Sequence, residues 1–566
     1  MRTAFFLRNV PVLAGLSDEL LEQLAAQVSE LRLPAARWIM REGDVAESMF
    51  IVRGGRIEVV HEGPPETLLR VLRRGDVLGE LALLREGVRA ASARTQRDTE
   101  LLELGRADFE RLIERAPSFA LGLTRALGAQ VAASRSPFVP AIPPRTIAVV
   151  GLDQAALTDE IGDSLADALA AHGPVARLRE GELAAIDQAE RDSNRVVLIA
   201  AGSTDAWTRL CVAECDVVVA LTTGKPDPVW TAEMTGLRDC ELLVLGSGVD
   251  AGTLATLQPR EVQVVAPGAR QAALELLARR LAGRSLGIVF SGGGARALAH
   301  VGVLEELQSA GVRFDRFGGV SLGSLIAAMA AMGLDSEAIV RTCEQGFVTA
   351  RPTNDFTLPA YSLIRGAKTR RLLRERFGEL AIEELPKRFF ALSCDLIARE
   401  PVVRRTGRLR DAVYSSLAIP GVFPPVTDGD GRLLVDGGVL DNLPVATMAR
   451  SGEGPVVAVD VTGQTGQFKR GGRPTLARFG RPLRRVLTGS EDTIPRLGET
   501  IVRSITVGST DTVAAARLHA DLVITPAVAG VALLDWKVLP RVRELGRAAA
   551  RQALAADPDL PARLGA

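Results

Sequence analysis

The stretch from Gly319 to Gly323 places Ser321 between two glycines, directly after an apolar run. This G-x-S-x-G spacing, with a strand expected before it and an apolar helix after it, is typical of a nucleophile elbow. Both glycines are needed because the strand and the helix pass very close, and the tight turn exposes the serine hydroxyl. The N–H of Leu322 is then a candidate donor to an oxyanion. The motif indicates a serine nucleophile, although a five-residue match also arises by chance.

A serine hydroxyl is a poor nucleophile at neutral pH and needs a neighbouring base. The chain has only four histidines, and the one near the motifs, His300, is expected to pack within a helix or lie on its surface. Asp436 follows an apolar strand and precedes Gly437 and Gly438, so its carboxylate is displayed at a strand end. We therefore predict a Ser321–Asp436 dyad. The alternative is a carboxylate that only caps its own D-G-G turn.

A glycine-rich turn follows the apolar strand that ends at Phe290. Gly292, Gly293 and Gly294 expose backbone N–H groups at the start of a helical run, and Arg296 comes two residues later. Amides at a helix N-terminus can hold developing negative charge. The turn is thus a candidate oxyanion hole, with a phosphate site or a plain tight turn as the alternatives.

A second group of polar residues lies in the first quarter of the chain. Glu80 stands between Gly79 and Leu81, and Arg89 and Ala90 follow nine and ten positions after it. A carboxylate can accept the ribose 2′-hydroxyl of a cyclic nucleotide, while an arginine fork and nearby N–H groups neutralise its ring phosphate. This spacing makes the pair a candidate nucleotide site.

The elements that must position these residues form successive segments. Short alternating runs with glycine turns predict an antiparallel β-roll with flanking helices over 1–136, and prolines mark a linker over 137–144. Apolar strands that alternate with helices predict a parallel-sheet α/β domain over 145–282, with no nucleotide loop and a scaffold or coupling role. A further α/β domain covers 283–465, and we expect 466–566 to be its helical extension.

The composition limits the kind of protein. Of 566 residues, 47% are hydrophobic and 24% charged, which suits large packed domains. The 68 basic and 68 acidic side chains cancel, so no nucleic-acid partner is expected. Five cysteines with no nearby histidine predict neither a disulfide framework nor a metal site. No signal peptide is expected, because the short apolar patch at the N-terminus is followed by acidic residues without a clear cleavage site. No transmembrane helix is expected either, because the longest uncharged stretch, 317–334, contains four glycines and a sharp turn motif.

The fourth of these segments resembles the patatin-like phospholipases, and within them the neuropathy target esterase branch. The resemblance is continuous over about 284–465, with these stretches in the family's order: GGGARALAHVGVLEEL, GGVSLGS, RFFALSCDL, SLAIPGVFPPV and VDGGVLDNLP. It implies a three-layer α/β/α fold and hydrolysis of a lipid carboxylic ester. The residues it assigns are the nucleophile Ser321, the base Asp436, and an oxyanion pocket around Gly292, Gly293, Gly294 and Arg296.

Two positions depart from the family's pattern. Ala297 stands where the family often has glycine, and Leu322 where it often has a smaller residue or methionine. Both substitutions keep the backbone donors, so we expect a changed pocket shape with the chemistry retained.

Most of residues 10–130 resemble the cyclic nucleotide-binding domain, with REGD, GGRIEVV and RRGD at the expected turns. The resemblance makes Glu80 and Arg89 the ligand anchors and cAMP the regulatory ligand, since Ala90 lacks the hydroxyl associated with cGMP preference. An interaction module that binds no nucleotide is an equal alternative. A transcription factor is disfavoured, because no basic recognition helix follows the roll.

Together these patterns predict a serine esterase that requires no cofactor and acts on phospholipids or lysophospholipids at a membrane surface. We expect a cytoplasmic protein that reaches the membrane peripherally, with cyclic nucleotide and a second copy of the chain as further candidate partners. The alternative is a catalytically idle sensor or scaffold on a hydrolase fold. The presence of both Ser321 and Asp436 disfavours that alternative.

Overall fold

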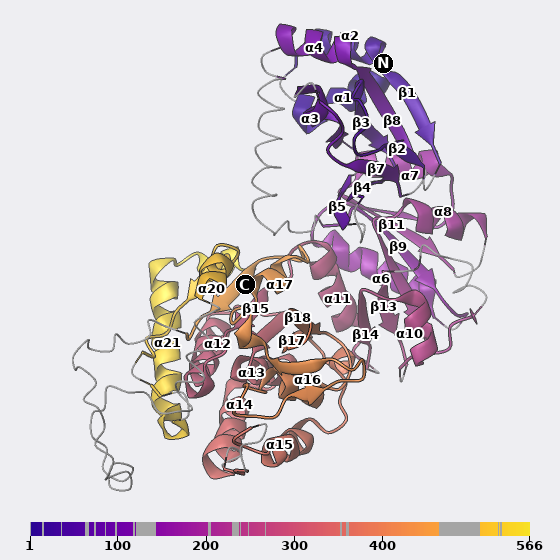
Figure 1. Ribbon diagram of the computed structural model, residues 1–566. Helices are drawn as coiled ribbons and strands as arrows, with labels where there is room; N and C mark the ends of the chain where they lie inside the picture. The colour runs from indigo at the N-terminus through magenta and orange to yellow at the C-terminus, as the bar shows by residue number, and fades with distance from the viewer. Residues whose placement is uncertain are drawn as a thin grey trace, which may run out of the picture. The chain divides into compact units, whose positions relative to one another are not determined.

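The structure is a computed structural model (Figure 1). The chain divides into two compact units, one of Met1–Val139 with Arg209–Cys215 and one of Pro140–Thr208 with Asp216–Ala566. The residues that the structure describes are 2–8, 10–13, 16–34, 37–62, 67–72, 75–84, 87–96, 99–116, 119, 143–154, 156–201, 205–228, 237, 239–246, 248–266, 268–350, 354–357, 362–462, 510–529, 531–532 and 535–565.

The first unit contains two four-stranded antiparallel sheets that share one apolar core. Alternating side chains from both sheets, such as Phe50, Ile57 and Leu101, are buried between them, as a strand's two-residue period requires. One sheet has the order β1 (Ser29–Leu33), β8 (Thr99–Gly105), β3 (Ser48–Gly54), β6 (Val77–Leu78); the other has β2 (Trp38–Met40), β7 (Ser92–Thr95), β4 (Ile57–His61), β5 (Thr67–Leu72). The predicted β-roll is confirmed.

Helices flank the roll, as expected. They pack around Phe109 and Leu24, and are α1 (Arg2–Arg8), α2 (Asp18–Gln27), α3 (Glu80–Leu84) and α4 (Arg106–Arg115). Residues 120–136 of the predicted first domain, and most of the proposed linker over 137–144, lie outside the described residues.

The second unit begins with a six-stranded sheet in which every pair is parallel. Its order is β10 (Val175–Leu178), β11 (Arg195–Ala200), β9 (Thr146–Gly151), β12 (Val217–Thr222), β13 (Glu241–Val244), β14 (Glu261–Val264). Helices α6 (Thr158–Ala170) and α11 (Arg270–Leu281) bury apolar side chains against one face of the sheet. Further helices of this unit are α7 (Leu183–Asp192) and α10 (Ala251–Leu257), while most residues of α8 (Ala206–Glu214) belong to the first unit. This confirms the predicted parallel α/β layer.

An eight-stranded mixed sheet follows, and it carries the predicted dyad. Its order is β19 (Val426–Thr427), β20 (Leu433–Asp436), β17 (Arg388–Asp395), β16 (Arg316–Val320), β15 (Gly287–Phe290), β21 (Val456–Val459), β22 (Leu522–Ile524), with β18 (Glu400–Arg404) paired to β17. The central strands are parallel, whereas β18 and β20 run antiparallel to β17.

Both faces of this sheet are covered, which makes three layers. Along β15, Ile288 and Phe290 face one core while Val289 faces the other. The larger core includes α12 (Ala299–Ser309), α13 (Leu322–Ala331), α14 (Ser336–Cys343), α15 (Ala367–Phe377), α16 (Leu409–Ser416) and α21 (Leu539–Ala556); the smaller includes α17 (Val445–Ala449) and α20 (Thr510–Arg517). Helix α22 (Leu560–Arg563) adds Leu560 to the larger core.

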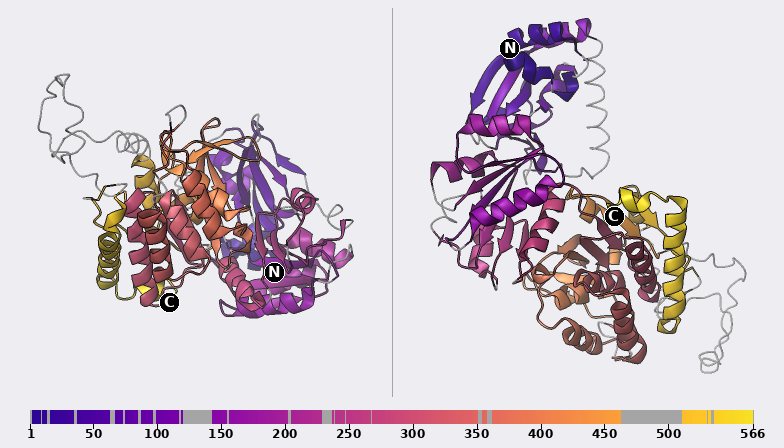
Figure 2. Two further views of the ribbon diagram at one scale, coloured as in Figure 1. Left: turned by 90° about the horizontal axis from the view of Figure 1, so that it is seen from below. Right: turned by 180° about the vertical axis from the view of Figure 1, so that it is seen from behind.

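The long helix α21 packs in the larger core of the mixed sheet, where it lies alongside α12 (Figures 1 and 2). A Cβ on Gly302 of α12 would lie 2.0 Å from the Arg543 carbonyl oxygen, and one on Gly546 would lie 2.0 Å from the Ala299 carbonyl oxygen. The two glycines therefore permit a very close helix contact. Arg543 and Arg547 add ion pairs to glutamates of α12.

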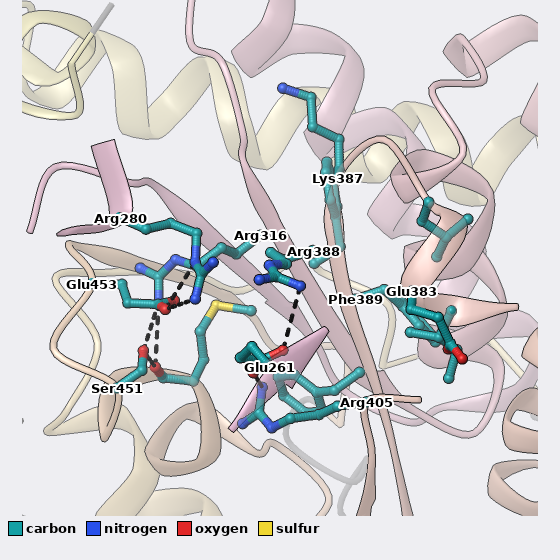
Figure 3. A pocket seen from close by; sticks show the side chains of 15 residues that line it. Glu261, Arg280, Arg316, Glu383, Lys387, Arg388, Phe389, Arg405, Ser451 and Glu453 are labelled. Atoms are coloured by element: carbon teal, nitrogen blue, oxygen red, sulfur yellow. Dashed lines mark hydrogen bonds and ion pairs between the residues drawn. The ribbon is translucent and has the colours of Figure 1, made fainter. Parts of the chain in front are cut away.

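The two sheets of the second unit meet at a buried ion network (Figure 3). Arg280, the penultimate residue of α11, pairs with Glu241 at 3.1 Å and bonds Glu453 through Nε at 2.8 Å. Arg388 of β17 reaches Glu241 at 3.4 Å and Glu261 at 3.5 Å. The arginines hold the pKa of Glu453 at about 2, below its usual value, despite burial that raises it. These pairs leave a cavity of only about 20 Å³, so the ion network fills most of the space where the two sheets meet.

Candidate active site

Ser321 lies at the sharp turn between β16 and α13. Its backbone has φ 53° and ψ −131°, a conformation that is strained for a residue with a side chain. A Cβ on Gly319 would lie 2.7 Å from the Gly323 carbonyl carbon, and one on Gly323 would lie 2.5 Å from the Ser291 carbonyl oxygen. Strand and helix therefore approach as closely as the sequence pattern predicted, and only glycine fits at these two positions.

Asp436 ends β20, and its carboxylate lies beside the serine. The Ser321 side chain is hydrogen-bonded to it, and the Gly438 N–H donates to Oδ1 at 2.8 Å. The carboxylate is therefore both the cap of its own turn and the partner of the serine, so the two interpretations of the D-G-G stretch coexist. Gly437 is required by space, because a Cβ there would lie 2.5 Å from the Leu392 carbonyl oxygen.

Burial controls the charge state of Asp436. The side chain is 5% exposed, and this desolvation raises the pKa of Asp436 to about 6, while the Ser321 hydroxyl and the Gly438 N–H lower it in part. Among the described residues, no lysine or arginine side chain lowers this pKa. A carboxylate with a pKa near 6 is suited to accept a proton at neutral pH.

The glycine turn after β15 packs against the nucleophile. A Cβ on Gly292 would lie 3.3 Å from Ser321 Cβ, and the Gly292 N–H is already used by the Asn442 carbonyl at 3.2 Å. Gly294 has φ 54° and begins a short 3₁₀ helix, Gly294–Leu298. The first N–H groups of a helix have no acceptor within it, so the amides of Gly293 and Gly294 are the better placed oxyanion donors of the three.

The predicted oxyanion residues Arg296 and Leu322 have different surroundings. Leu322 is the first residue of α13, so its N–H also stands at a helix start beside Ser321. The Arg296 side chain is 7% exposed, and its Nε donates to the Val531 carbonyl at 2.7 Å. That contact ties the glycine turn to the C-terminal part of the chain.

Two polar residues that the sequence analysis did not single out support the dyad. The Ser321 N–H donates to Ser416 Oγ at 2.9 Å, and that hydroxyl donates to the Leu392 carbonyl at 2.7 Å. Asn442 Nδ2 donates to the Gly292 carbonyl at 3.4 Å. Both residues fall inside family-like stretches, SLAIPGVFPPV and VDGGVLDNLP, which were the available signal.

His300 has a packing role and does not face the dyad. It is fully buried in α12, its ring stacks on Phe290 with centroids 4.7 Å apart, and its Nε2–H donates to the Ser291 carbonyl at 2.9 Å. Burial lowers the pKa of His300 to about 4. The imidazole is therefore neutral at physiological pH and helps to shape the glycine turn.

The polar group of the roll is also brought together. Arg89 is 5% exposed, and its guanidinium donates to the Gly79 carbonyl at 2.9 Å and to the Ser48 carbonyl at 2.7 Å. Gly79 has φ 86°, and a Cβ there would lie 2.3 Å from Arg89 Nη1. Burial lowers the pKa of Arg89 overall, although the carboxylates of Asp44 and, to a smaller extent, the buried Glu80 raise it in part.

The structure says less about the two other candidate nucleotide contacts of that group, Ala90 and Leu81. Ala90 is exposed next to Arg89, and Leu81 lies in α3, directly after Glu80. Within the described part of the chain, no cluster of His, Cys, Asp and Glu could hold a metal ion. Nor does any helix there have the length and apolar character needed to cross a membrane.

Comparison with known families defines the class of protein. The family "Patatin-like phospholipase" matches residues 288–449, and the family "Cyclic nucleotide-binding domain" matches residues 30–116. The fold and the elbow thus belong to a patatin-type domain that follows a cyclic nucleotide-binding domain in one chain.

Full-length relatives narrow this to one family. An "Uncharacterized NTE family protein" of Mycobacterium tuberculosis is 34% identical over 99% of this chain and 97% of its own. The chain therefore belongs to the NTE family. Neuropathy target esterase sws of Drosophila melanogaster is 27% identical over 76% of this chain and 36% of its own length, and human patatin-like phospholipase domain-containing protein 6 is 29% identical over 76% and 37%.

The roll also resembles solved structures. The regulatory domain of Toxoplasma gondii PKA with cAMP is 30% identical over 19% of this chain and 42% of that chain, with a TM-score of 0.19.

Proposed function

We propose that this protein is a serine esterase that hydrolyses carboxylic esters of phospholipids or lysophospholipids, with Ser321 as nucleophile and Asp436 as base. One observation carries the proposal: the Ser321 hydroxyl, at a strained elbow, is hydrogen-bonded to a buried carboxylate whose pKa is raised to about 6. A hydrolase elbow and a matched base are what nucleophilic attack by serine requires.

The reaction proceeds in two halves. Asp436 accepts the Ser321 proton as Oγ bonds the ester carbonyl carbon, and the oxyanion forms beside the Gly293, Gly294 and Leu322 amides. The intermediate collapses by breaking the bond to the alkoxy oxygen, which leaves with the proton from Asp436. A water molecule, deprotonated by Asp436, then attacks the acyl carbon. The bond from that carbon to Ser321 Oγ breaks, Asp436 returns the proton to Oγ, and the carboxylic acid is released.

The test is hydrolysis of lysophosphatidylcholine by the full chain and by Ser321→Ala. We expect the wild type to release fatty acid and Ser321→Ala to lose on the order of 10⁴-fold or more in rate, because the dyad acts as a unit. The matched control is Ser324→Ala, a buried serine one turn further along α13, which is expected to keep most of the rate. Equal rates for wild type and Ser321→Ala would refute the proposal, and a wild type without turnover would favour the idle scaffold.

The roll supports a second candidate function, regulation by a cyclic nucleotide. The support is the family match over 30–116 and the placement of Glu80 and Arg89 side by side. Arg89 donates one N–H to each of two carbonyl groups, which leaves three of its five N–H donors for the ring phosphate of cAMP. Calorimetry of the full chain with cAMP and with cGMP tests this. If no heat of binding is detected with either ligand, the roll is an interaction module that binds no nucleotide.

The proposal also assigns a role to each segment of the chain. The hydrolase domain is 283–465 with its extension 466–566, the α/β domain 145–282 is a scaffold that the Arg280 network fastens to it, and 1–136 is the regulatory domain. The protein acts peripherally at a membrane, where its lipid substrate lies.

A further inference from the structure

Basic side chains are concentrated around one helix of the hydrolase domain. Residues 365–377 contain six arginines and lysines and one glutamate, a net charge of +5 in a chain whose total formal charge is zero. Helix α15 makes up most of this segment. A local excess of one charge on a neutral protein points to a partner of the opposite charge.

The helix turns this charge outward. Its buried residues, Thr369, Leu373 and Phe377, recur every fourth position and face the core, so Arg371 and Arg374 lie on the exposed side. Arg371 has one weak ion pair, to Glu375 at 3.8 Å. The start of α15 is fixed, because Gly366 has φ 70° and a Cβ there would lie 2.3 Å from the Tyr414 hydroxyl.

An exposed aromatic side chain lies beside the start of this helix. Phe356 is 71% exposed, although its backbone pairs with Ile364. The neighbouring Asp355 fixes this segment to the start of α15. Its carbonyl accepts a hydrogen bond from the Arg365 N–H at 2.9 Å, and its carboxylate accepts one from the Lys368 N–H at 3.2 Å. A large apolar side chain held in water next to exposed cations is the composition of a membrane-surface element.

The far end of α15 lines an apolar recess. The recess has a volume of about 400 Å³, a floor of Met329, Met332 and Phe377, and the guanidinium groups of Arg341 and Arg376 among its lining. Its size is that of small-ligand sites. An apolar recess beside cations suits an anionic lipid, which has both an acyl chain and a charged headgroup. An acidic protein surface would pair with the cations but would leave the recess unfilled.

One segment of the chain contacts both the start of α15 and the strand of Asp436. The N–H groups of Leu363 and Ile364, just before α15, donate to the carbonyls of residues 421 and 422 at 2.9 and 3.0 Å. The same segment includes Ala418, whose carbonyl accepts from the Asp436 N–H at 2.9 Å. Backbone hydrogen bonds therefore connect the start of α15, through residues 418–422, to the strand end that carries Asp436.

We propose that the α15 surface, defined as Phe356, Arg365, Lys368, Arg371 and Arg374, docks the hydrolase domain on an anionic phospholipid bilayer. The proposal rests on the proposed function in one respect: it explains how an esterase without a described membrane span reaches lipid. The cations bind the headgroups and Phe356 inserts at the interface.

The experiment measures sedimentation of the full chain carrying Ser321→Ala, which cannot turn over lipid, with vesicles of phosphatidylcholine alone or mixed with phosphatidylglycerol. We expect binding only to the mixed vesicles, weakened by salt. Arg371→Glu with Arg374→Glu should weaken binding about tenfold or more, and Phe356→Ser about tenfold. The matched controls are Arg313→Glu with Arg541→Glu, exposed arginines elsewhere, and Leu518→Ser, 85% exposed; both should bind as the parent does.

A second readout separates docking from chemistry. The α15 variants, made with Ser321 intact, should hydrolyse a water-soluble ester at the wild-type rate but lose rate on mixed vesicles. Equal binding of the parent to both vesicle types, or unchanged binding of the α15 variants, would overturn the docking proposal. Intact vesicle binding with no esterase activity in the wild type would refute the proposed function and leave the docking surface standing.

Discussion

Asp436 in the hydrolase domain and Arg89 in the roll are both charged side chains with only 5% exposure. Arg89 gives two of its N–H groups to backbone carbonyls of its own unit, Gly79 and Ser48. Asp436 receives one backbone N–H, from Gly438, and a hydroxyl that is itself the proposed nucleophile. The charge of Arg89 is therefore satisfied by hydrogen bonds within the fold, whereas the charge of Asp436 is only partly satisfied and is available to accept a proton.

This difference predicts opposite effects on stability and activity. A buried charge that its surroundings do not compensate costs stability, whereas removal of a well-bonded one leaves its partners unsatisfied. Replacing Asp436 should lose activity and gain stability, and replacing Arg89 should lose stability and keep activity. The predictions below test that contrast.

Asp436→Asn should lower kcat for a soluble ester by about 10²–10⁴-fold, because it removes the general base. The amide oxygen can still accept from the Gly438 N–H, so the turn should persist. Steady-state kinetics on purified variant and wild type measure this. A loss of less than a few-fold would remove Asp436 from the mechanism.

The same variant should be more stable than wild type at high pH. The folded pKa of about 6 lies above the ordinary value of about 3.9, so the ionised carboxylate destabilises the fold fully above pH 6 and not at all below about pH 4. Asp436→Asn should therefore gain about 2–3 kcal/mol at pH 8 and nothing near pH 4. Thermal unfolding of the variant and the wild type at the two pH values checks this. A variant less stable than the wild type at pH 8 would contradict the claim that the Asp436 carboxylate costs stability.

Arg89→Met should destabilise the first unit by about 2–4 kcal/mol, because the Gly79 and Ser48 carbonyls lose charged hydrogen bonds. Esterase activity on a soluble ester should not change. The control is Arg32→Met, whose side chain is 79% exposed in its pair with Glu100 and which should cost less than about 1 kcal/mol. Denaturant unfolding followed by a probe in the roll gives both values, and equal losses would show that Arg89 is not specially bonded.

The pH profile of kcat/KM should follow one deprotonation. Asp436 must be ionised to act as base, so the rate should fall about tenfold per pH unit below the pKa of about 6 and stay level above it. A profile that is flat between pH 5 and 8 would mean that another group accepts the proton.

The smallest effect is expected at Ser416, which positions the elbow through the Ser321 N–H. Ser416→Ala should lower kcat about tenfold or less and leave KM unchanged, since the residue does not touch substrate. Ser415→Ala, a neighbour bonded to Ser393, is the matched control. If both variants kept the wild-type kcat, the positioning role would be wrong.

The sequence was most informative where function depends on adjacent residues. Strand, glycine and serine spacing around Ser321 predicted the elbow because the required close approach, 2.5–2.7 Å for an added Cβ, can be met only by glycine at Gly319 and Gly323. The alternating runs of the roll and the apolar strands of both α/β layers were predicted for the same reason, since their periods are local.

What could not be predicted depends on contacts between distant residues. Arg296 reaches the Val531 carbonyl, 235 positions away, and Ser416 supports Ser321 from 95 positions away. The Arg280 network likewise joins residues 39 and 173 positions apart. No spacing rule encodes such pairs. The cations of α15 are visible in the sequence, but only the fold shows which side of the helix they occupy.

The most direct test of the dyad is to map the adduct of a fluorophosphonate probe on the full chain by mass spectrometry. The account predicts one adduct, on Ser321, formed rapidly by wild type, slowly by Asp436→Asn, and absent from Ser321→Ala. Labelling of a different serine, or equal labelling rates for wild type and Asp436→Asn, would contradict it.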